Sequence, residues 1–344
     1  PVSEEPLKGL YGNTMAWDEG KKTYTLTAYT TVNLTADKTI DARFVGDYKL
    51  TIKSTGNGSP FPLTCSYDFK DVTPDKGDVN AMFKINALKV EGANLTATVK
   101  NSQVQGCFIY NVGGLEVSGK SIVTISNENA DRIMAGGTTM KIDGKDATVI
   151  VNGASSFSTQ LTMTSGATLE IENPKNTAGN IYANGVDGAT ITVTGAKTGN
   201  HGLFFYGAKT SAKGESDAGV LTNSTITTDG MVGFYGSDKE IDATGTTIKA
   251  DTLGAVRATK VMAQKDESGN ITVSAQYFEA ASISGATLMV KEIVAPITPG
   301  YQSHEGQTLN MDGVVFAGKT TVSKGAEVVL SGESFVNAGA ALDV

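Results

Sequence analysis

A short pattern of small and apolar residues recurs along most of the chain. In its clearest copy, a turn at Gly188-Ala189 is followed by a strand with apolar side chains at Ile191 and Val193. Related copies begin at Gly92, Asp146, Gly166, Gly245, Gly285 and Gly325. Repeats of roughly 20 to 50 residues are typical of solenoids, in which one unit buries its apolar side chains only by stacking on the next.

Two further apolar strands precede most copies of this pattern. The first strands contain Phe83, Phe108, Ile133, Phe157, Ile181, Phe205, Phe234, Val256 and Phe278. The last strand of each unit contains apolar pairs such as Leu169/Ile171, Ile271/Val273 and Leu288/Val290. Alternation within each strand points one set of side chains inward, and parallel crossovers are right-handed. The sequence therefore predicts an all-β fold, a right-handed parallel β-helix with three short strands per turn of about 24 residues.

The pattern divides the chain near residue 80. Residues 1–80 are expected to form an N-terminal cap and first irregular turns. Residues 56–78 are expected to form a protruding Pro-rich loop or hairpin, because their prolines exclude a ladder strand through the whole stretch. Residues 81–344 are expected to form the regular β-helix, interrupted by loops near 207–220 and 296–308. Because the chain starts without Met and ends without an obvious cap, we expect it to be a segment of a longer protein.

One candidate binding surface follows from the alignment of the first strands. Tyr182, Tyr206 and Tyr235 each follow the inward apolar residue, and Arg257 holds the same place one turn later. Stacked in successive turns, they would form an exposed aromatic ladder suited to sugar rings or to a protein interface. The alternative is that these tyrosines face the core or lie beneath the 207–220 loop.

Threonine is frequent at alternate strand positions. The runs at 190–194 and 225–227 have the Thr-x-Thr form of an ice-binding face. The uneven spacing of such runs predicts a broken register, and threonine suits any exposed strand. We therefore expect no ice-binding face.

Composition bears on the function classes. The formal net charge of -8 argues against a nucleic-acid partner, and the chain has no apolar run long enough to span a membrane. The two histidines, His201 and His304, have no neighbouring nucleophile, and the carboxylates are scattered, so we expect neither an enzyme nor a metal or other cofactor. The alternative is a secreted polysaccharide lyase or hydrolase, or a phage-type spike.

The chain contains two cysteines, Cys65 and Cys107. They lack the paired spacing of a zinc site. The sequence leaves open whether they form one disulfide or remain two buried free thiols.

The Gly-Ala-Thr turns, the Phe-Tyr-Gly segments at 205–207 and 234–236, and the segment 323–331 together resemble passenger domains of bacterial autotransporters. The resemblance covers roughly residues 80 to 344. It implies a β-helix exported across the outer membrane to the cell surface. It also implies a role in adhesion, self-association or biofilm formation, with host or bacterial surface proteins or glycans as partners. The low cysteine content fits such export, because stable disulfides hinder passage through a translocating pore.

Overall fold

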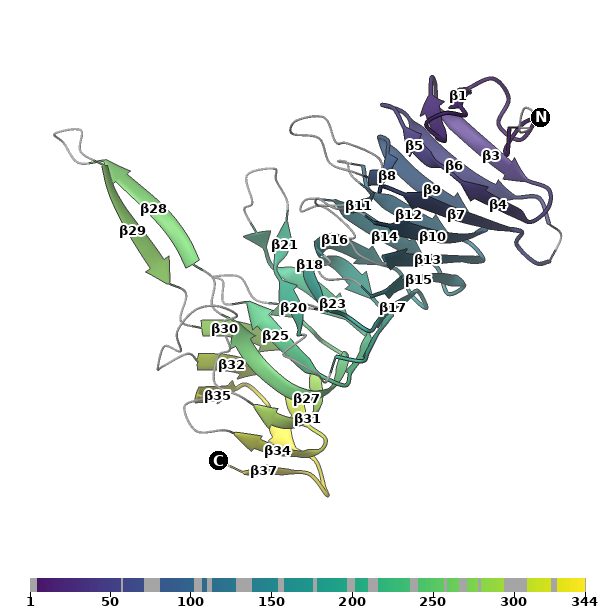
Figure 1. Cartoon of the computed structure of the whole chain (residues 1–344). Coiled ribbons are helices and arrows are strands. Elements are labelled where there is room, and N and C mark those ends of the chain that lie inside the picture. The colour runs from purple at the N-terminus through teal and green to yellow at the C-terminus, as the bar shows by residue number, and fades with distance from the viewer. Residues whose placement is uncertain are drawn as a thin grey trace.

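The computed structural model describes residues 5–56, 58–70, 81–101, 107–109, 113–127, 138–153, 158–175, 178–196, 202–209, 216–235, 241–256, 259–265, 271–277, 280–293, 308–322 and 327–343. Within these residues, every regular element is a strand. Figure 1 shows the strands stacked in layers between the two termini. Most of them belong to one sheet of 28 strands, which pair in parallel from layer to layer. The fold is therefore an all-β, parallel, solenoid-like stack, as the coarse part of the prediction required.

Three columns of strands form the walls of the stack, and we number them in the order in which the chain visits them. The second column consists of β3 (Thr30–Leu34), β6 (Lys49–Ser54), β9 (Ala87–Glu91), β12 (Leu115–Ser118), β14 (Thr139–Asp143), β16 (Ser158–Met163), β18 (Gly179–Asp187), β23 (Gly219–Thr222), β26 (Ile241–Asp242), β30 (Ala280–Ser284), β32 (Thr308–Asp312) and β35 (Glu327–Ser331).

The third column consists of β4 (Lys38–Asp41), β7 (Pro62–Asp68), β10 (Asn94–Lys100), β13 (Ser121–Asn127), β15 (Ala147–Asn152), β17 (Thr168–Glu172), β19 (Thr190–Thr194), β24 (Thr225–Thr228), β27 (Thr247–Val256), β31 (Thr287–Ile293), β33 (Val315–Phe316) and β36 (Phe335–Val336).

The first column has two described parts. The N-terminal part consists of β2 (Thr23–Leu26), β5 (Arg43–Val45), β8 (Ala81–Lys84) and β11 (Cys107–Ile109). The C-terminal part consists of the start of β18, β20 (Leu203–Tyr206), β25 (Met231–Tyr235), the ends of β27 and β31, β34 (Lys319–Val322) and β37 (Ala341–Asp343).

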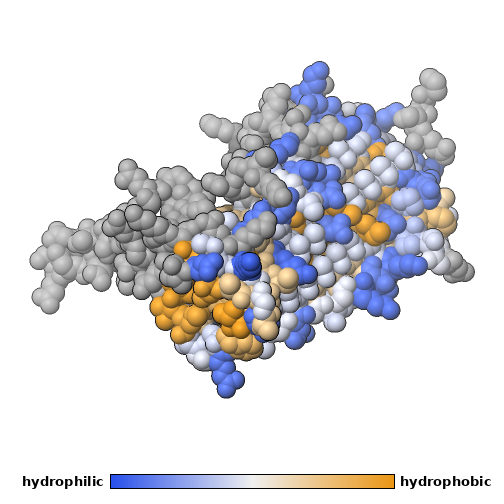
Figure 2. All heavy atoms as spheres, turned by 90° about the horizontal axis from the view of Figure 1, so that it is seen from below, coloured by the Kyte–Doolittle hydropathy of each residue, from blue (hydrophilic) through white to orange (hydrophobic). Residues whose placement is uncertain are grey.

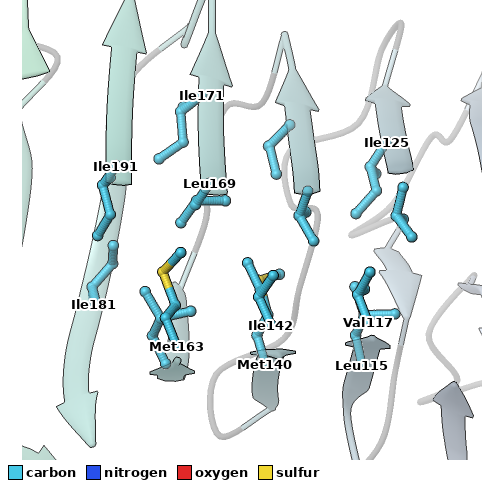
Figure 3. Packing of buried hydrophobic residues seen from close by; sticks show 14 of the residues in the cluster. Leu115, Val117, Ile125, Met140, Ile142, Met163, Leu169, Ile171, Ile181 and Ile191 are labelled. Atoms are coloured by element: carbon cyan, nitrogen blue, oxygen red, sulfur yellow. The ribbon is translucent and has the colours of Figure 1, made fainter. Parts of the chain in front are cut away.

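The core lies between the columns and consists of aligned apolar side chains. In the third column, each of nine inward residues is in register with the next, and all are 0 % exposed: Leu95, Val123, Val149, Leu169, Ile191, Ile226, Ile248, Leu288 and Phe316. Figure 3 shows part of this core, with side chains of the second and third columns pointing toward one another. Full burial of such a side chain is worth about 1.5–3 kcal/mol, so the stacked layers stabilise one another.

The turn between the second and third columns explains the recurring glycine. Gly188 has a φ of 62°, and a Cβ there would lie 3.1 Å from the Ser165 Cα in the layer before it. Asn223 takes the corresponding place one layer later with a φ of 49°. Asparagine adopts this left-handed conformation more readily than most residues, so the turn persists without glycine.

The segment 56–78 differs from the prediction of a protruding loop. β7 lies within it and pairs in parallel with both β4 and β10. Pro62 is the first residue of β7, where the missing N–H costs least. The prediction of a protruding loop or hairpin was therefore wrong for 62–68, because a proline at the first position of a strand leaves the ladder intact.

A second difference concerns residues predicted to continue the regular layers. Ile271 and Val273 lie in β29 (Ile271–Tyr277), which pairs antiparallel with β28 (Thr259–Lys265). This hairpin extends away from the stack in Figure 1. The prediction of a third strand at 271–273 was wrong, because alternation of apolar residues does not distinguish a hairpin strand from a ladder strand. Phe278 and residues 296–307 lie outside the described residues.

A smaller hairpin occupies part of the predicted 207–220 loop. It consists of β21 (Ala208–Lys209) and β22 (Ser216–Asp217), which pair antiparallel. It follows β20 and precedes β23, so it leaves the stack between the first and second columns. Its base lies next to the tyrosines that the sequence singled out.

Candidate binding surface

Tyr182 and Tyr206 lie side by side on the outer surface of the first column. They are opposite each other in the pairing of β18 with β20, and their rings stack with centroids 4.8 Å apart and planes 27° apart. Both side chains are half-buried, whereas the preceding residues, Ile181 and Phe205, are 0 % exposed in the core. The alternation of the strand therefore turns the tyrosines outward.

Polar groups surround this pair of rings. The Lys209 Nζ lies 5.4 Å from the centroid of the Tyr182 ring, within the range of a cation–π contact. The Tyr206 hydroxyl donates a hydrogen bond of 3.3 Å to Asn180 Oδ1. An aromatic surface with an amine and an amide beside it can combine ring stacking with directed hydrogen bonds.

Asn184 fixes the position of Lys209. Its Nδ2 donates to the Lys209 carbonyl oxygen at 2.9 Å, and the Lys209 N–H donates to Asn184 Oδ1 at 3.0 Å. These two hydrogen bonds join the base of the β21–β22 hairpin to β18 in the layer before it. The rings and the amine are therefore held by strands and paired hydrogen bonds.

The sequence prediction missed the two asparagines, although a pattern in the sequence could have identified them. Asn180, Tyr182 and Asn184 alternate along β18, and each is half-buried. The period-two pattern that placed Tyr182 outward applies equally to both neighbours.

The structure does not describe the side chains of the other two predicted members of the ladder, Tyr235 and Arg257, so their part in it stays a prediction. The backbone of Tyr235 lies in β25, but its side chain is outside the described part of the structure. β25 pairs with β27 so that Phe234 is opposite Ala255 and Tyr235 is opposite Val256. Ala255 is therefore opposite Phe234, so the alignment of Val256 with the inward phenylalanines was wrong by one position. Arg257 itself lies outside the described residues.

The charges on the second column neutralise one another. Lys89 Nζ lies 3.0 Å from Glu91 Oε2 and 3.4 Å from Glu116 Oε1, and Lys53 Nζ lies 3.1 Å from Glu91 Oε1. Hydrogen bonds from Lys89 and Lys53 hold the pKa of the Glu91 carboxyl below its usual range. This wall is a network of paired charges and offers little uncompensated charge to a ligand.

Cys65 is a free, fully buried thiol in β7. Its Sγ donates a hydrogen bond of 3.2 Å to the Ala42 carbonyl oxygen, and burial raises the pKa of the thiol far above its usual range. Cys107 begins β11 opposite Ala81, and its side chain is outside the described residues. Of the two alternatives for the cysteines, the disulfide is not formed, because Cys65 points into the core of the third column.

Among the residues that the structure describes, no three His, Cys, Asp or Glu side chains are grouped so that they could hold a metal ion. That part of the chain also has no helix with the length and apolarity needed to span a membrane. His201 and His304 lie outside it.

No family model, curated protein or solved structure matches this chain.

Proposed function

We propose that this chain is a non-enzymatic adhesin of a bacterial cell surface, exported across the outer membrane as an autotransporter passenger segment. The observation that carries the proposal is the outward stack of Tyr182 and Tyr206 with Lys209 and Asn180 beside it. Aromatic side chains give large contact areas at low entropic cost and dominate many recognition surfaces. A surface glycan or protein of a host or of another bacterium would be the ligand.

The fold supports this function through its shape. We propose that the stack is a right-handed parallel β-helix with three strands and about 24 residues per turn, since parallel crossovers are almost always right-handed. A solenoid presents extended walls on which successive layers repeat their side chains. Such walls suit the binding of extended or repeating surface ligands.

The test is binding of the purified chain to a glycan array and to whole cells. The variant Tyr182→Ala/Tyr206→Ala should lose binding, because both rings of the stack are removed. A matched control is Tyr29→Ala/Tyr48→Ala, which removes another exposed tyrosine pair whose rings meet edge-on at 77°. Equal binding by the wild-type chain and the Tyr182/Tyr206 variant would overturn the proposed site, and consumption of a glycan would point to an enzyme.

A further inference from the structure

The outer surface of the third column carries an unbroken row of threonines. Six of them are in register on consecutive strands from β15 to β31: Thr148, Thr168, Thr190, Thr225, Thr247 and Thr287. The prediction of a broken register concerned the two rows of a Thr-x-Thr face, and this single row is in register. The uneven sequence spacing comes from segments between the strands, such as the two hairpins, and these leave the register of the ladder intact.

A second row lies two residues further along the same strands. In layer order it consists of Ile150, Glu170, Thr192, Thr227, Lys249 and Met289. The threonine row is continued at its two ends by Ile122 and Val315. We call these two rows, with Ile122 and Val315, the threonine strip.

The order of side chains in the threonine strip is self-complementary. A two-fold axis along the strands, midway between β19 and β24, reverses the order of the layers. It would place Glu170 opposite Lys249 of a second copy, and Thr192 opposite Thr227. The same axis would pair the apolar residues, Ile150 with Met289 and Ile122 with Val315. In a two-fold interface each such contact occurs twice.

We propose that the threonine strip is an isologous interface through which two copies of this chain associate with antiparallel axes. The threonine rows would face each other, and a hydroxyl both donates and accepts hydrogen bonds, so identical rows can satisfy one another. Opposite charges and apolar pairs at matching positions fix the register.

The charges of the threonine strip support a partner outside the chain. Neither Glu170 nor Lys249 has an ion-pair partner among the described residues, in contrast to the paired lysines and glutamates of the second column. Met289 and Ile122, near the two ends of the strip, are 43 % and 44 % exposed, so a second copy on this face would remove their apolar surface from water. A second copy on this face would pair both charges and cover both apolar side chains.

The same two-fold symmetry predicts where the interface ends along the strands. The next outward positions on β17 and β27 are Glu172 and Asp251, both half-buried. The axis would bring these two carboxylates toward each other, so the contact should end there. This inference specifies the self-association expected of such an adhesin and does not involve Tyr182 or Tyr206.

The experiment is sedimentation equilibrium of the purified chain over a range of concentrations. The wild-type chain should show a monomer–dimer equilibrium. Glu170→Lys and Lys249→Glu should each weaken the dimer by about tenfold or more, since each sets like charges opposite one another twice. An equimolar mixture of the two variants should dimerise again, because the lysine introduced in one variant then meets the glutamate introduced in the other. The double variant should also recover.

Glu172→Lys is the matched control. It makes the same charge change two residues from Glu170, but it should leave the dimer as strong or stronger because it removes a like-charge contact. Circular dichroism would establish that each variant remains folded. A wild-type chain that stays monomeric, or a dimer that Glu170→Lys does not weaken, would overturn the proposal. A Tyr182→Ala/Tyr206→Ala variant should still dimerise, so failure of the ligand-binding site and failure of this interface are distinguishable.

Discussion

The two ends of the stack differ in how their core side chains are covered. At the N-terminal end, β1 (Met15–Asp18) pairs antiparallel with β2, and Trp17 packs on Tyr24 with ring centroids 4.5 Å apart. Tyr24 is 0 % exposed. At the C-terminal end, Leu330 and Val336 are each 42 % exposed. Figure 2 views the molecule from below and shows hydrophobic side chains gathered at this end.

The contribution of an apolar core side chain to stability depends on the position of its layer along the stack. Leu330 is in register with Met311, and Val336 with Phe316, yet Met311 and Phe316 are 0 % exposed. Core side chains of the same columns are thus buried inside the stack and partly exposed to solvent in the last layer. In a solenoid each layer is buried by both neighbours, so a layer with one neighbour contributes less.

The largest loss of stability should come from a charge placed in the core in the middle of the stack. Ile191→Asp would bury a carboxylate between Leu169 and Ile226, and we expect unfolding free energy to fall by about 4 kcal/mol or more. Urea denaturation followed by circular dichroism measures it. Thr194→Asp, at an exposed position of the same strand, should change stability by less than about 0.5 kcal/mol. Equal losses would mean that Ile191 does not face the core.

The next effect compares two residues of one column at the C-terminal end. Met311→Ala should cost about 2–5 kcal/mol because it opens a cavity in a filled layer. Leu330→Ala, one layer later, should cost less than about 1 kcal/mol because the side chain is already partly hydrated. Both values come from the same denaturation experiment. A large loss for Leu330→Ala would show that the last layer is covered in solution.

A smaller effect is expected at the N-terminal end. The Leu7 N–H donates a hydrogen bond of 2.9 Å to the buried Tyr24 hydroxyl. Tyr24→Phe would leave this N–H without its acceptor, at a cost of about 1–3 kcal/mol. Hydrogen exchange should quicken at Leu7 and along β1 and β2, while the C-terminal strands stay unchanged. Tyr29→Phe, which alters a tyrosine that is 72 % exposed, should have no effect.

The smallest expected effect is on the loss of stability as the pH falls. The Glu91 pKa is held low in the folded chain by Lys89 and Lys53, so this stabilisation is present above the ordinary glutamate pKa and is lost as pH falls through the lowered value. The charges are partly exposed, so the contribution should stay below about 1 kcal/mol. Stability measured from neutral pH down to about pH 3 should fall less steeply in Glu91→Gln. An unchanged profile would show that the network is not stabilising.

The sequence predicted the repeating layers well because the turn and the inward positions carry local signals. The Gly-Ala turn at Gly188 and the inward Leu169 and Ile191 lie where the pattern placed them. The outward stack of Tyr182 and Tyr206 also follows from alternation within β18 and β20. Each of these features depends only on residues close together in the chain.

The features that the sequence misplaced or missed depend on pairing between strands that are far apart in the chain. Which residue of β27 is opposite Phe234 depends on the pairing of β27 with β25, and it is Ala255 where the apolar pattern had selected Val256. The threonines are unevenly spaced in the sequence because segments of different length lie between the strands. These segments do not change the register in which the strands pair. Lys209 reaches Tyr182 only because Asn184, a residue of another layer, holds the hairpin base.

The buried thiol of Cys65 provides a reporter of local opening. A thiol with a raised pKa and no contact with solvent reacts only when the layers around it separate. In a Cys107→Ser background, the rate of labelling by a thiol reagent would therefore time the opening of the strands beside β7. Because Cys65 is a free thiol, the strands beside β7 are held together by packing and ladder hydrogen bonds, with no covalent cross-link from this residue.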